Sequence, residues 1–328
     1  MKNKNHRVII EGFWNSGKTR IAKNLKECGF SFINEPSGPE NTIKDRDGIK
    51  KWYLKNHYIK EIALTKKNKS AVLERSELAA FAYEYITGGE VPRIKEILHL
   101  KNMIEKNNIL LSYIKIAENN TKLKGKNYSN GINYIIKSEN KLTLYNNWYT
   151  DIVPHRLGFG VFVINIKNNS QKELKLATKS IITCLNKNRI AQVNVVVCRK
   201  NKNGKINVLI LKRNCKKGGF WQTITGGVHI GENFYDAAKR ELREEIAVMA
   251  KKIKYTDYHY SFIGGDGYEL HEYVYVAELD IDESEKIKIS DEHDEFKWLN
   301  PKNAIEKIKF EENKEAIKKS INIIKNGL

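Results

Sequence analysis

The chain has 328 residues, a net charge of +19 and a hydrophobic content of 41%. At about 150 residues per domain this length predicts about two domains, each with its own core, and the composition argues against a disordered chain. No apolar run is long enough to predict a membrane span or a secretion signal. None of the four cysteines lies in a CxxC pair, so neither a zinc site nor a disulfide framework is indicated. We therefore expect a reducing, cytoplasmic location.

The positive charge is concentrated in the first part of the chain. Residues 1–187 contain 33 Lys+Arg and 17 Asp+Glu, a balance of +16, whereas residues 188–328 contain 25 and 22, a balance of +3. Such asymmetry fits contact with a polyanion such as RNA, or a solvated lysine-rich surface with some phosphate-binding residues. The lysines are scattered along the sequence rather than grouped in runs, which favours a solvated lysine-rich surface.

Short apolar runs alternate with helically spaced segments along residues 1–187. Strands are expected at 6–11, 30–34, 71–73, 109–117 and 159–166, and helices at 20–28, 49–66, 76–86, 91–106, 135–151 and 172–186. Strands that alternate with helices favour a three-layer α/β domain, with helices on both faces of a parallel sheet.

Residues 188–328 follow a different pattern and are expected to form a second domain. Two strands, 191–199 and 205–212, flank an Asn203-Gly204 turn, which is a strong hairpin signal. Further expected elements are a helix at 233–246, strands at 255–262 and 271–279, and a helix at 303–326.

The turn after the first strand fits the pattern G-x-x-x-x-G-K-[ST]. Glycines at its fixed positions would let backbone N–H groups point at one phosphate, and the following helix N-terminus adds partial positive charge. Lys18 would reach the β- and γ-phosphates, and the Thr19 hydroxyl would hold Mg²⁺. The predicted nucleotide-binding residues are Gly12, Asn15, Ser16, Gly17, Lys18 and Thr19.

Polar residues also follow the second and third strands. Glu35 ends the second strand, and Glu74 and Arg75 end the third. The carboxyl ends of parallel strands form the ligand crevice, so both carboxylates are expected to face the phosphate loop. One could accept a proton from an attacking hydroxyl while the other helps to hold the metal, and Arg75 could clamp a phosphate. Ion pairing at the strand ends is the simpler alternative for either segment.

Residues 6–187 resemble the deoxynucleoside kinase and thymidylate kinase group of P-loop kinases. The resemblance implies that Glu35 is the base for a nucleoside hydroxyl, that Glu74 and Arg75 supply metal and acceptor contacts, and that ATP is the phosphoryl donor. It also implies a basic lid, for which Lys122, Lys124 and Lys126 have about the right position. The usual lid arginines are missing here, and a solvated lysine run is the alternative.

A second group of charged residues lies on the helix expected at 233–246. Glu241, Glu244 and Glu245 are spaced i, i+3 and i+4 and therefore share one helix face. Carboxylates this close repel one another unless a cation lies between them, and oxygen ligands suit Mg²⁺ or Mn²⁺. Arg240 could brace Glu232 from the preceding loop.

Together with Gly226, these residues resemble the Nudix box, G-x5-E-x7-R-E-U-x-E-E-x-G-U, in every position except the last glycine, which is Ala247 here. The resemblance covers residues 190–328 and implies a Nudix α/β/α sandwich that hydrolyses a nucleoside diphosphate linked to another group. The resemblance implies Glu241, Glu244 and Glu245 as metal ligands, which the Gly226 carbonyl could join. Alanine at position 247 should strain the helix C-terminus without touching the carboxylates.

Sequence around the box is similar to the dihydroneopterin triphosphate and dATP pyrophosphatase branch, which cleaves a triphosphate to monophosphate and pyrophosphate. The similar segments are Phe220–Gly227, Ser290–His293 with Trp298, and Asn313–Ile317. Glu292 is then a candidate for the water-activating base, with an ordinary loop glutamate as the alternative.

The sequence therefore predicts a P-loop nucleoside or nucleotide kinase-like domain at 1–187, fused to a Nudix pyrophosphohydrolase at 188–328. Its partners would be nucleotides and nucleosides, without a membrane. One alternative is a Nudix domain that acts on ADP-ribose, a dinucleotide or capped RNA. In another, the P-loop half is an RNA-binding or sensor module that regulates the hydrolase. Base preference and oligomeric state stay open.

Overall fold

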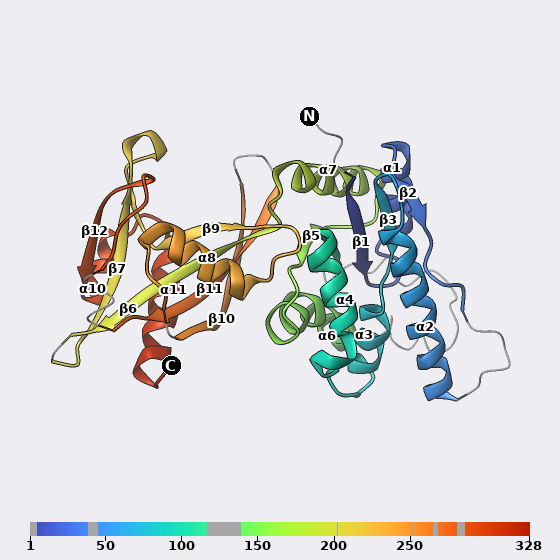
Figure 1. Cartoon of the computed structure of the whole chain (residues 1–328), viewed down its shortest axis with the longest axis horizontal. Coiled ribbons are helices and arrows are strands. Elements are labelled where there is room, and N and C mark those ends of the chain that lie inside the picture. The colour runs from blue at the N-terminus through green and yellow to red at the C-terminus, as the bar shows by residue number, and fades with distance from the viewer. Residues whose placement is uncertain are drawn as a thin grey trace. The chain divides into compact units, whose positions relative to one another are not determined.

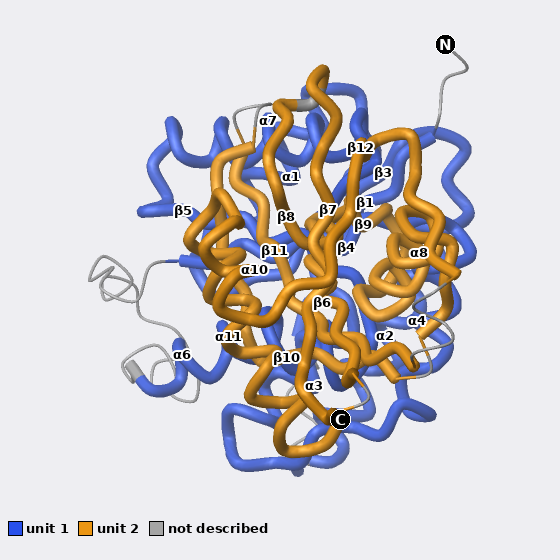
Figure 2. The backbone as a smooth tube through the Cα atoms, turned by 90° about the vertical axis from the view of Figure 1, so that its left-hand side faces the viewer, with its two compact units in different colours: residues 1–190 blue, residues 191–328 orange. Residues whose placement is uncertain are grey.

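The computed structural model describes residues 5–38, 45–116, 139–201, 203–250, 252–264, 268–280 and 286–328. The chain divides into two compact units, residues 1–190 and residues 191–328, which Figure 2 shows in different colours. Among the described residues, no helix combines the length and the apolar character that a membrane span requires.

The first unit is built on a five-stranded sheet. Its strands are β1 (Arg7–Gly12), β2 (Ser31–Ile33), β3 (Ala71–Glu74), β4 (Ile109–Ile116) and β5 (Phe162–Ile166). All neighbours are parallel, in the spatial order β2-β3-β1-β4-β5. The central strands β1, β3 and β4 are buried almost throughout, which explains their continuous apolar runs. This confirms the parallel sheet expected for residues 1–187.

Helices connect these strands and lie on both sides of the sheet (Figure 1). They are α1 (Lys18–Glu27), α2 (Arg46–Thr65), α3 (Leu78–Ile86), α4 (Ile94–Asn107), α6 (Glu139–Asn147), the π-helix η2 (Trp148–Arg156) and α7 (Gln171–Lys187). Helices α1 and α7 pack together, and the Asn24 side-chain amide donates a hydrogen bond of 3.2 Å to the Thr178 hydroxyl.

The segment expected as one helix over 135–151 is more complex. Its described part begins as α6 and widens at Trp148 into η2, which continues beyond Pro154 to Arg156. The wider turn places Trp148 and Tyr149 in the core, where both are fully buried. Helical periodicity of 3.6 residues does not describe such a turn, so this transition could not be read from apolar spacing.

The second unit is built on a seven-stranded mixed sheet. Its strands are β6 (Ala191–Lys200), β7 (Ile206–Arg213), β8 (Trp221–Gln222), β9 (Ile224–Val228), β10 (Lys252–Ile263), β11 (Glu269–Glu278) and β12 (His293–Leu299). The main order is β10-β11-β6-β7-β12, with β8 beside β7 and β9 beside β6. Strands β6 and β7 pair antiparallel, which confirms the predicted hairpin. Strand β12 was not predicted, because its charged residues hide any apolar alternation.

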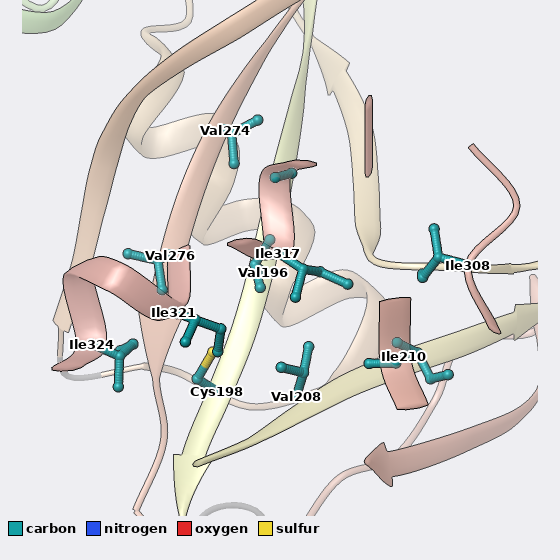
Figure 3. Close-up of a cluster of buried hydrophobic side chains, with 12 residues drawn as sticks. Val196, Cys198, Val208, Ile210, Val274, Val276, Ile308, Ile317, Ile321 and Ile324 are labelled. Carbon is teal, nitrogen blue, oxygen red and sulfur yellow. The ribbon is translucent and has the colours of Figure 1, made fainter. Parts of the chain in front are cut away.

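The described part of this unit also contains three α-helices and a 3₁₀ turn. They are η3 (Cys215–Lys217), α8 (Phe234–Ile246), α10 (Pro301–Lys307) and α11 (Glu311–Lys325). Strand β6 alternates between its two faces, and Val196 and Cys198 point into a buried cluster beneath α11 (Figure 3). Helix α8 packs against β6 and β9 through Phe234 and Leu242, among others. A sheet between helices on two faces is the sandwich that the sequence predicts.

The single helix expected at 303–326 is in fact two helices. Asn300 caps α10 by accepting a hydrogen bond of 3.0 Å from the Asn303 N–H, and Pro301 occupies the first helical turn. The chain becomes extended at Ile308, whose side chain is buried in the cluster of Figure 3. No proline or glycine lies at this break. The helix is interrupted where Ile308 packs into the core.

Ala247 ends α8 with a left-handed backbone, at φ 56° and ψ 24°. Glycine adopts this conformation without the clash that a Cβ atom causes. We expect Ala247→Gly to raise the free energy of unfolding of the second unit by about 1 kcal/mol, measured by urea denaturation. Ala238→Gly, in the middle of the same helix, is the control and should lower it by about 1 kcal/mol or more. Equal destabilisation by both changes would contradict this explanation.

Candidate active sites

The loop between β1 and α1 is compact and closes on itself. Gly17 has φ 87° and directly precedes the first residue of α1, and the Ser16 N–H donates to the Phe13 carbonyl at 3.2 Å. A Cβ atom on Gly17 would lie 2.5 Å from Leu174 Cδ2 of α7, so a larger residue would have to adopt a left-handed backbone and also displace the buried Leu174 side chain. The amino end of α1 thus begins at a tight turn, a geometry that suits anions.

Two polar side chains of this loop are buried without a full set of partners. The Lys18 ammonium donates to the Phe13 carbonyl at 2.9 Å, and burial, together with the nearby Arg75 charge, lowers the pKa of Lys18 to about 7. The Ser16 hydroxyl is also buried, and no described group bonds to it. A bound anion would supply the negative charge and the acceptor atoms that these two groups lack.

The ends of β2 and β3 bring further predicted residues to this loop. The Thr19 hydroxyl donates to Glu74 Oε1 at 2.7 Å, and Arg75 Nε forms an ion pair with Glu35 Oε2 at 2.7 Å. The Arg75 guanidinium also lies over the Trp14 ring, at 5.0 Å from its centroid. The strand order therefore places Glu35, Glu74 and Arg75 together beside Thr19. Lys122, Lys124 and Lys126 lie outside the described residues.

A buried carboxylate under this loop was not anticipated. Glu11 is fully buried; its Oε1 accepts from the Ser76 N–H and hydroxyl at 2.7 and 2.6 Å, and its Oε2 accepts from the Tyr149 hydroxyl at 2.9 Å. Burial raises the pKa of Glu11 despite these hydrogen bonds and the nearby Arg75 charge. The network joins β1, the segment after β3 and η2, and the Glu11 charge interacts with that of Arg75. Nothing local marks Glu11, because its partners are 65 and 138 residues away.

In the second unit, Arg240 of α8 organises the acidic residues. Its Nε and Nη2 donate to the two oxygens of Glu232 at 2.8 and 2.9 Å, as the spacing of the sequence suggested. Its Nη1 donates to Glu241 at 2.5 Å and to Glu244 at 3.1 Å, and its Nη2 also donates to the Gly227 carbonyl at 2.7 Å. This fork fixes the loop after β9 against the carboxylate face of α8.

Gly226 of β9 leaves the space that Glu241 occupies. A Cβ atom at Gly226 would lie 1.8 Å from Glu241 Cδ, so the carboxylate packs directly on the glycine backbone. Burial raises the pKa of Glu241, opposed by Arg240 and reinforced by the Glu244 and Glu245 charges. The sequence prediction that the Gly226 backbone and this carboxylate share one site is thus consistent with their contact.

Glu245 lies one turn from Glu241 and has its own partners. Its Oε2 accepts from the Ser290 hydroxyl at 2.6 Å and lies 2.9 Å from His293 Nδ1. Burial alone would raise the pKa of Glu245, but the hydrogen bonds from His293 and Ser290 and the charges of His293 and Arg213 lower it on balance. The roles of Ser290 and His293 were missed, although both belong to a segment that the sequence singled out.

Glu292, the candidate base, is attached differently. Its Oε2 pairs with Arg213 Nη2 at 3.1 Å, and its side chain is 44% exposed. Its backbone carbonyl accepts from the Asn214 N–H at 2.9 Å, which ties this segment to the end of β7. Glu292 therefore lies next to His293, the partner of Glu245, and its carboxylate is paired with Arg213.

The donors gathered around α8 are of the kind that Mg²⁺ or Mn²⁺ prefers. They are the oxygens of Glu241, Glu244 and Glu245 together with the nearby Gly226 backbone. Arg240 already compensates the charge of Glu241 and Glu244, and in this arrangement the three carboxylates do not converge within 4.8 Å of one another. The residues fit a hard divalent cation, which would replace part of the arginine's neutralising role.

Comparison with known proteins supports part of this picture. Residues 189–320 match the NUDIX domain family. The solved structures of a C. elegans Ap4A hydrolase and of the E. coli dihydroneopterin triphosphate pyrophosphohydrolase are each 24% identical. They match 42% and 40% of this chain and 98% and 96% of theirs, with TM-scores of 0.36 and 0.34.

An octanoyltransferase of Myxococcus xanthus is 29% identical to this chain over 124 residues. The match covers 37% of this chain and 34% of that protein, so the chain spans about a third of that relative. The family match and the carboxylate-bearing helix fall in the same part of the chain, and residues 189–320 are therefore similar to NUDIX domains.

Proposed function

We propose that the second unit is a Mg²⁺-dependent pyrophosphohydrolase of a (deoxy)nucleoside triphosphate or a related nucleoside diphosphate derivative. The observation that carries this proposal is the Arg240 fork, which holds Glu232 and the carboxylate face of α8 together within the region that matches the NUDIX domain family. When bound, the cation would polarise a phosphoryl oxygen and help to ionise the attacking water.

The protein's own groups would divide the remaining tasks. Glu241 and Glu244 would supply oxygen ligands to the cation. The Ser290 and His293 hydrogen bonds would keep Glu245 ionised and oriented as a further ligand. Glu292 would accept the proton of the attacking water, or act as a further ligand, after release from Arg213.

A substrate screen tests this proposal. The purified chain with Mg²⁺ is given each common NTP and dNTP, and separately ADP-ribose, a dinucleotide and capped RNA, and anion-exchange chromatography identifies the products. Monophosphate with pyrophosphate from a triphosphate would support the favoured class, whereas cleavage of ADP-ribose, a dinucleotide or a cap would move the proposal to the alternative substrates. No cleavage of any of them would contradict it.

Gly226→Ala offers a test of the proposed metal ligands. The added Cβ atom must push the end of the Glu241 side chain away, and because that end is flexible the fold should survive. We expect Mg²⁺ activation to weaken by about tenfold or more, a size typical of disturbed ligand positioning. The measurement is the Mg²⁺ concentration for half-maximal hydrolysis, and Ala250→Gly, beyond the end of α8, is the control. An unchanged Mg²⁺ requirement would exclude Glu241 as a ligand.

We further propose that the first unit binds ATP and transfers its γ-phosphoryl group to a (deoxy)nucleoside or nucleoside monophosphate. The observation that favours this activity is the convergence of Lys18, Thr19 and Glu74 with the Arg75–Glu35 pair at one edge of a parallel sheet. Glu35 would take the acceptor proton, Arg75 would clamp the acceptor, and Thr19 with Glu74 would hold the Mg²⁺ of ATP.

Incubation of the chain with radiolabelled ATP and each nucleoside or monophosphate tests this second proposal. Label on an acceptor would support it. If ATP binds without transfer to any acceptor, and RNA binds with a steep dependence on salt, the first unit is better described as a sensor or RNA-binding module.

A further inference from the structure

Three potential metal ligands converge in the first unit, and none of them is among the nucleotide-binding residues proposed above. Glu61 comes from α2, Glu77 directly precedes α3, and His99 comes from α4. One ligand atom from each lies within 4.8 Å of the other two, and no other such trio occurs among the described residues. None of these residues has a role in the proposed phosphoryl transfer.

The two carboxylates are almost completely buried, and two of their oxygens make no hydrogen bond. Glu61 is fully buried and Glu77 is 2% exposed. Glu61 Oε1 accepts from the Glu77 N–H at 2.8 Å, but Glu61 Oε2 and Glu77 Oε1 make no hydrogen bond. Burial raises the pKa of both groups, to about 7 for Glu61 and to about 9 for Glu77, and their mutual repulsion adds to the rise at Glu77. Burial therefore favours the protonated form of both carboxyl groups unless a cation lies beside them.

The distances suit ligands of a single ion. His99 Nε2 lies 3.1 Å from Glu77 Oε2 and 4.0 Å from Glu61 Oε2. Atoms bound to one ion at about 2.1 Å are separated by about 3 to 4.2 Å, and both distances fall in this range. The unbonded oxygen Glu61 Oε2 is the atom that faces His99. The His99 side chain is 41% exposed, which leaves a route for an ion and for completing water ligands.

We propose that Glu61, Glu77 and His99 form a divalent transition-metal site, best suited to Zn²⁺. Two carboxylates and an imidazole balance the charge of such an ion and match the nitrogen and oxygen ligands that Zn²⁺ accepts. Mg²⁺, which binds imidazole poorly, is a weak competitor. In the absence of the ion, a proton shared by the carboxylates or donated by His99 would partly replace it.

Such an ion would connect three helices to the proposed phosphate site. It would cross-link α2, α3 and α4, and Glu77 follows Glu74 and Arg75 by only three and two residues. The predicted effect is therefore structural. Zn²⁺ should stabilise the fold around the end of β3, by an amount that grows with free Zn²⁺ relative to its dissociation constant.

Zinc counting on the full chain tests this inference. The protein is stripped with a chelator and dialysed against buffered micromolar Zn²⁺ without nucleotide, and bound zinc is measured by mass spectrometry. The wild type is compared with His99→Gln, with Glu61→Gln, and with Asn102→Ala, an exposed neutral position on α4 that serves as the control. Folding of each variant is verified by circular dichroism, and melting curves are recorded with and without Zn²⁺.

The expected result is one zinc ion fewer per chain in His99→Gln and Glu61→Gln than in the wild type and Asn102→Ala. Zinc should also raise the melting temperature of the wild type and of Asn102→Ala more than that of His99→Gln and Glu61→Gln. Zinc bound elsewhere, for example at exposed Cys28 or Cys215, contributes equally to all four and cancels. Equal zinc content in the wild type and in folded His99→Gln would overturn the proposal.

Discussion

Glu245→Gln should reduce pyrophosphate-bond hydrolysis by at least about 10²-fold while leaving phosphoryl transfer by the first unit unchanged. The glutamine keeps the shape of the side chain and one acceptor oxygen for the Ser290 hydroxyl, so the fold should persist. It removes the negative charge that a metal or an activated water requires. The measurement is the hydrolysis rate at saturating substrate and Mg²⁺, beside a separate assay of transfer.

The matched control is Glu306→Gln, an exposed position on α10 in the same unit, which should keep full activity. Equal loss of both activities in Glu245→Gln would contradict two independent sites. Retained hydrolysis would mean that Glu245 serves only to fix His293, and the catalytic assignment would then fail.

Lys18→Met should slow phosphoryl transfer by about 10² to 10³-fold. The reason is that the Lys18 ammonium is expected to stabilise the negative charge of the transferred phosphoryl group in the transition state. Methionine is close to lysine in volume and avoids burying a cation, so the first unit should not lose stability. Lys18 is buried and its pKa is lowered, as expected for an ammonium group whose anionic partner is not bound. Transfer rate and ATP affinity are both measured.

Lys23→Met, on the exposed side of the same helix, is the control for this change. It removes the same charge from the unit but not from the loop, so transfer should continue. If Lys18→Met transfers phosphate normally, or if Lys23→Met is equally impaired, the loop is not the phosphate site.

Much of both sites is local in sequence and was therefore predictable. The phosphate loop is a run of eight residues, and the α8 carboxylates follow helical spacing, so their proximity needs no tertiary information. Strand order then explains why Glu35 and Glu74 reach the same edge as Thr19. The alternation of strands and helices likewise predicted the parallel sheet of the first unit.

The rest depends on contacts between distant residues. Glu245 meets Ser290 and His293 more than 40 residues later, and Glu11 meets Tyr149 138 residues later. The Glu61, Glu77 and His99 cluster is assembled from α2, the residue before α3, and α4. Such pairs leave no periodic signal, and a buried carboxylate in a strand looks like any other polar residue until its partners are placed.

We propose above that the second unit hydrolyses a nucleotide pyrophosphate bond. Phosphorus NMR can identify the products directly. The sample is the Lys18→Met protein with Mg²⁺ and a nucleoside triphosphate found active in the screen. This background removes transfer and γ-phosphate hydrolysis by the first unit. We expect equimolar nucleoside monophosphate and pyrophosphate as the products. Nucleoside diphosphate with inorganic phosphate as the products would contradict it.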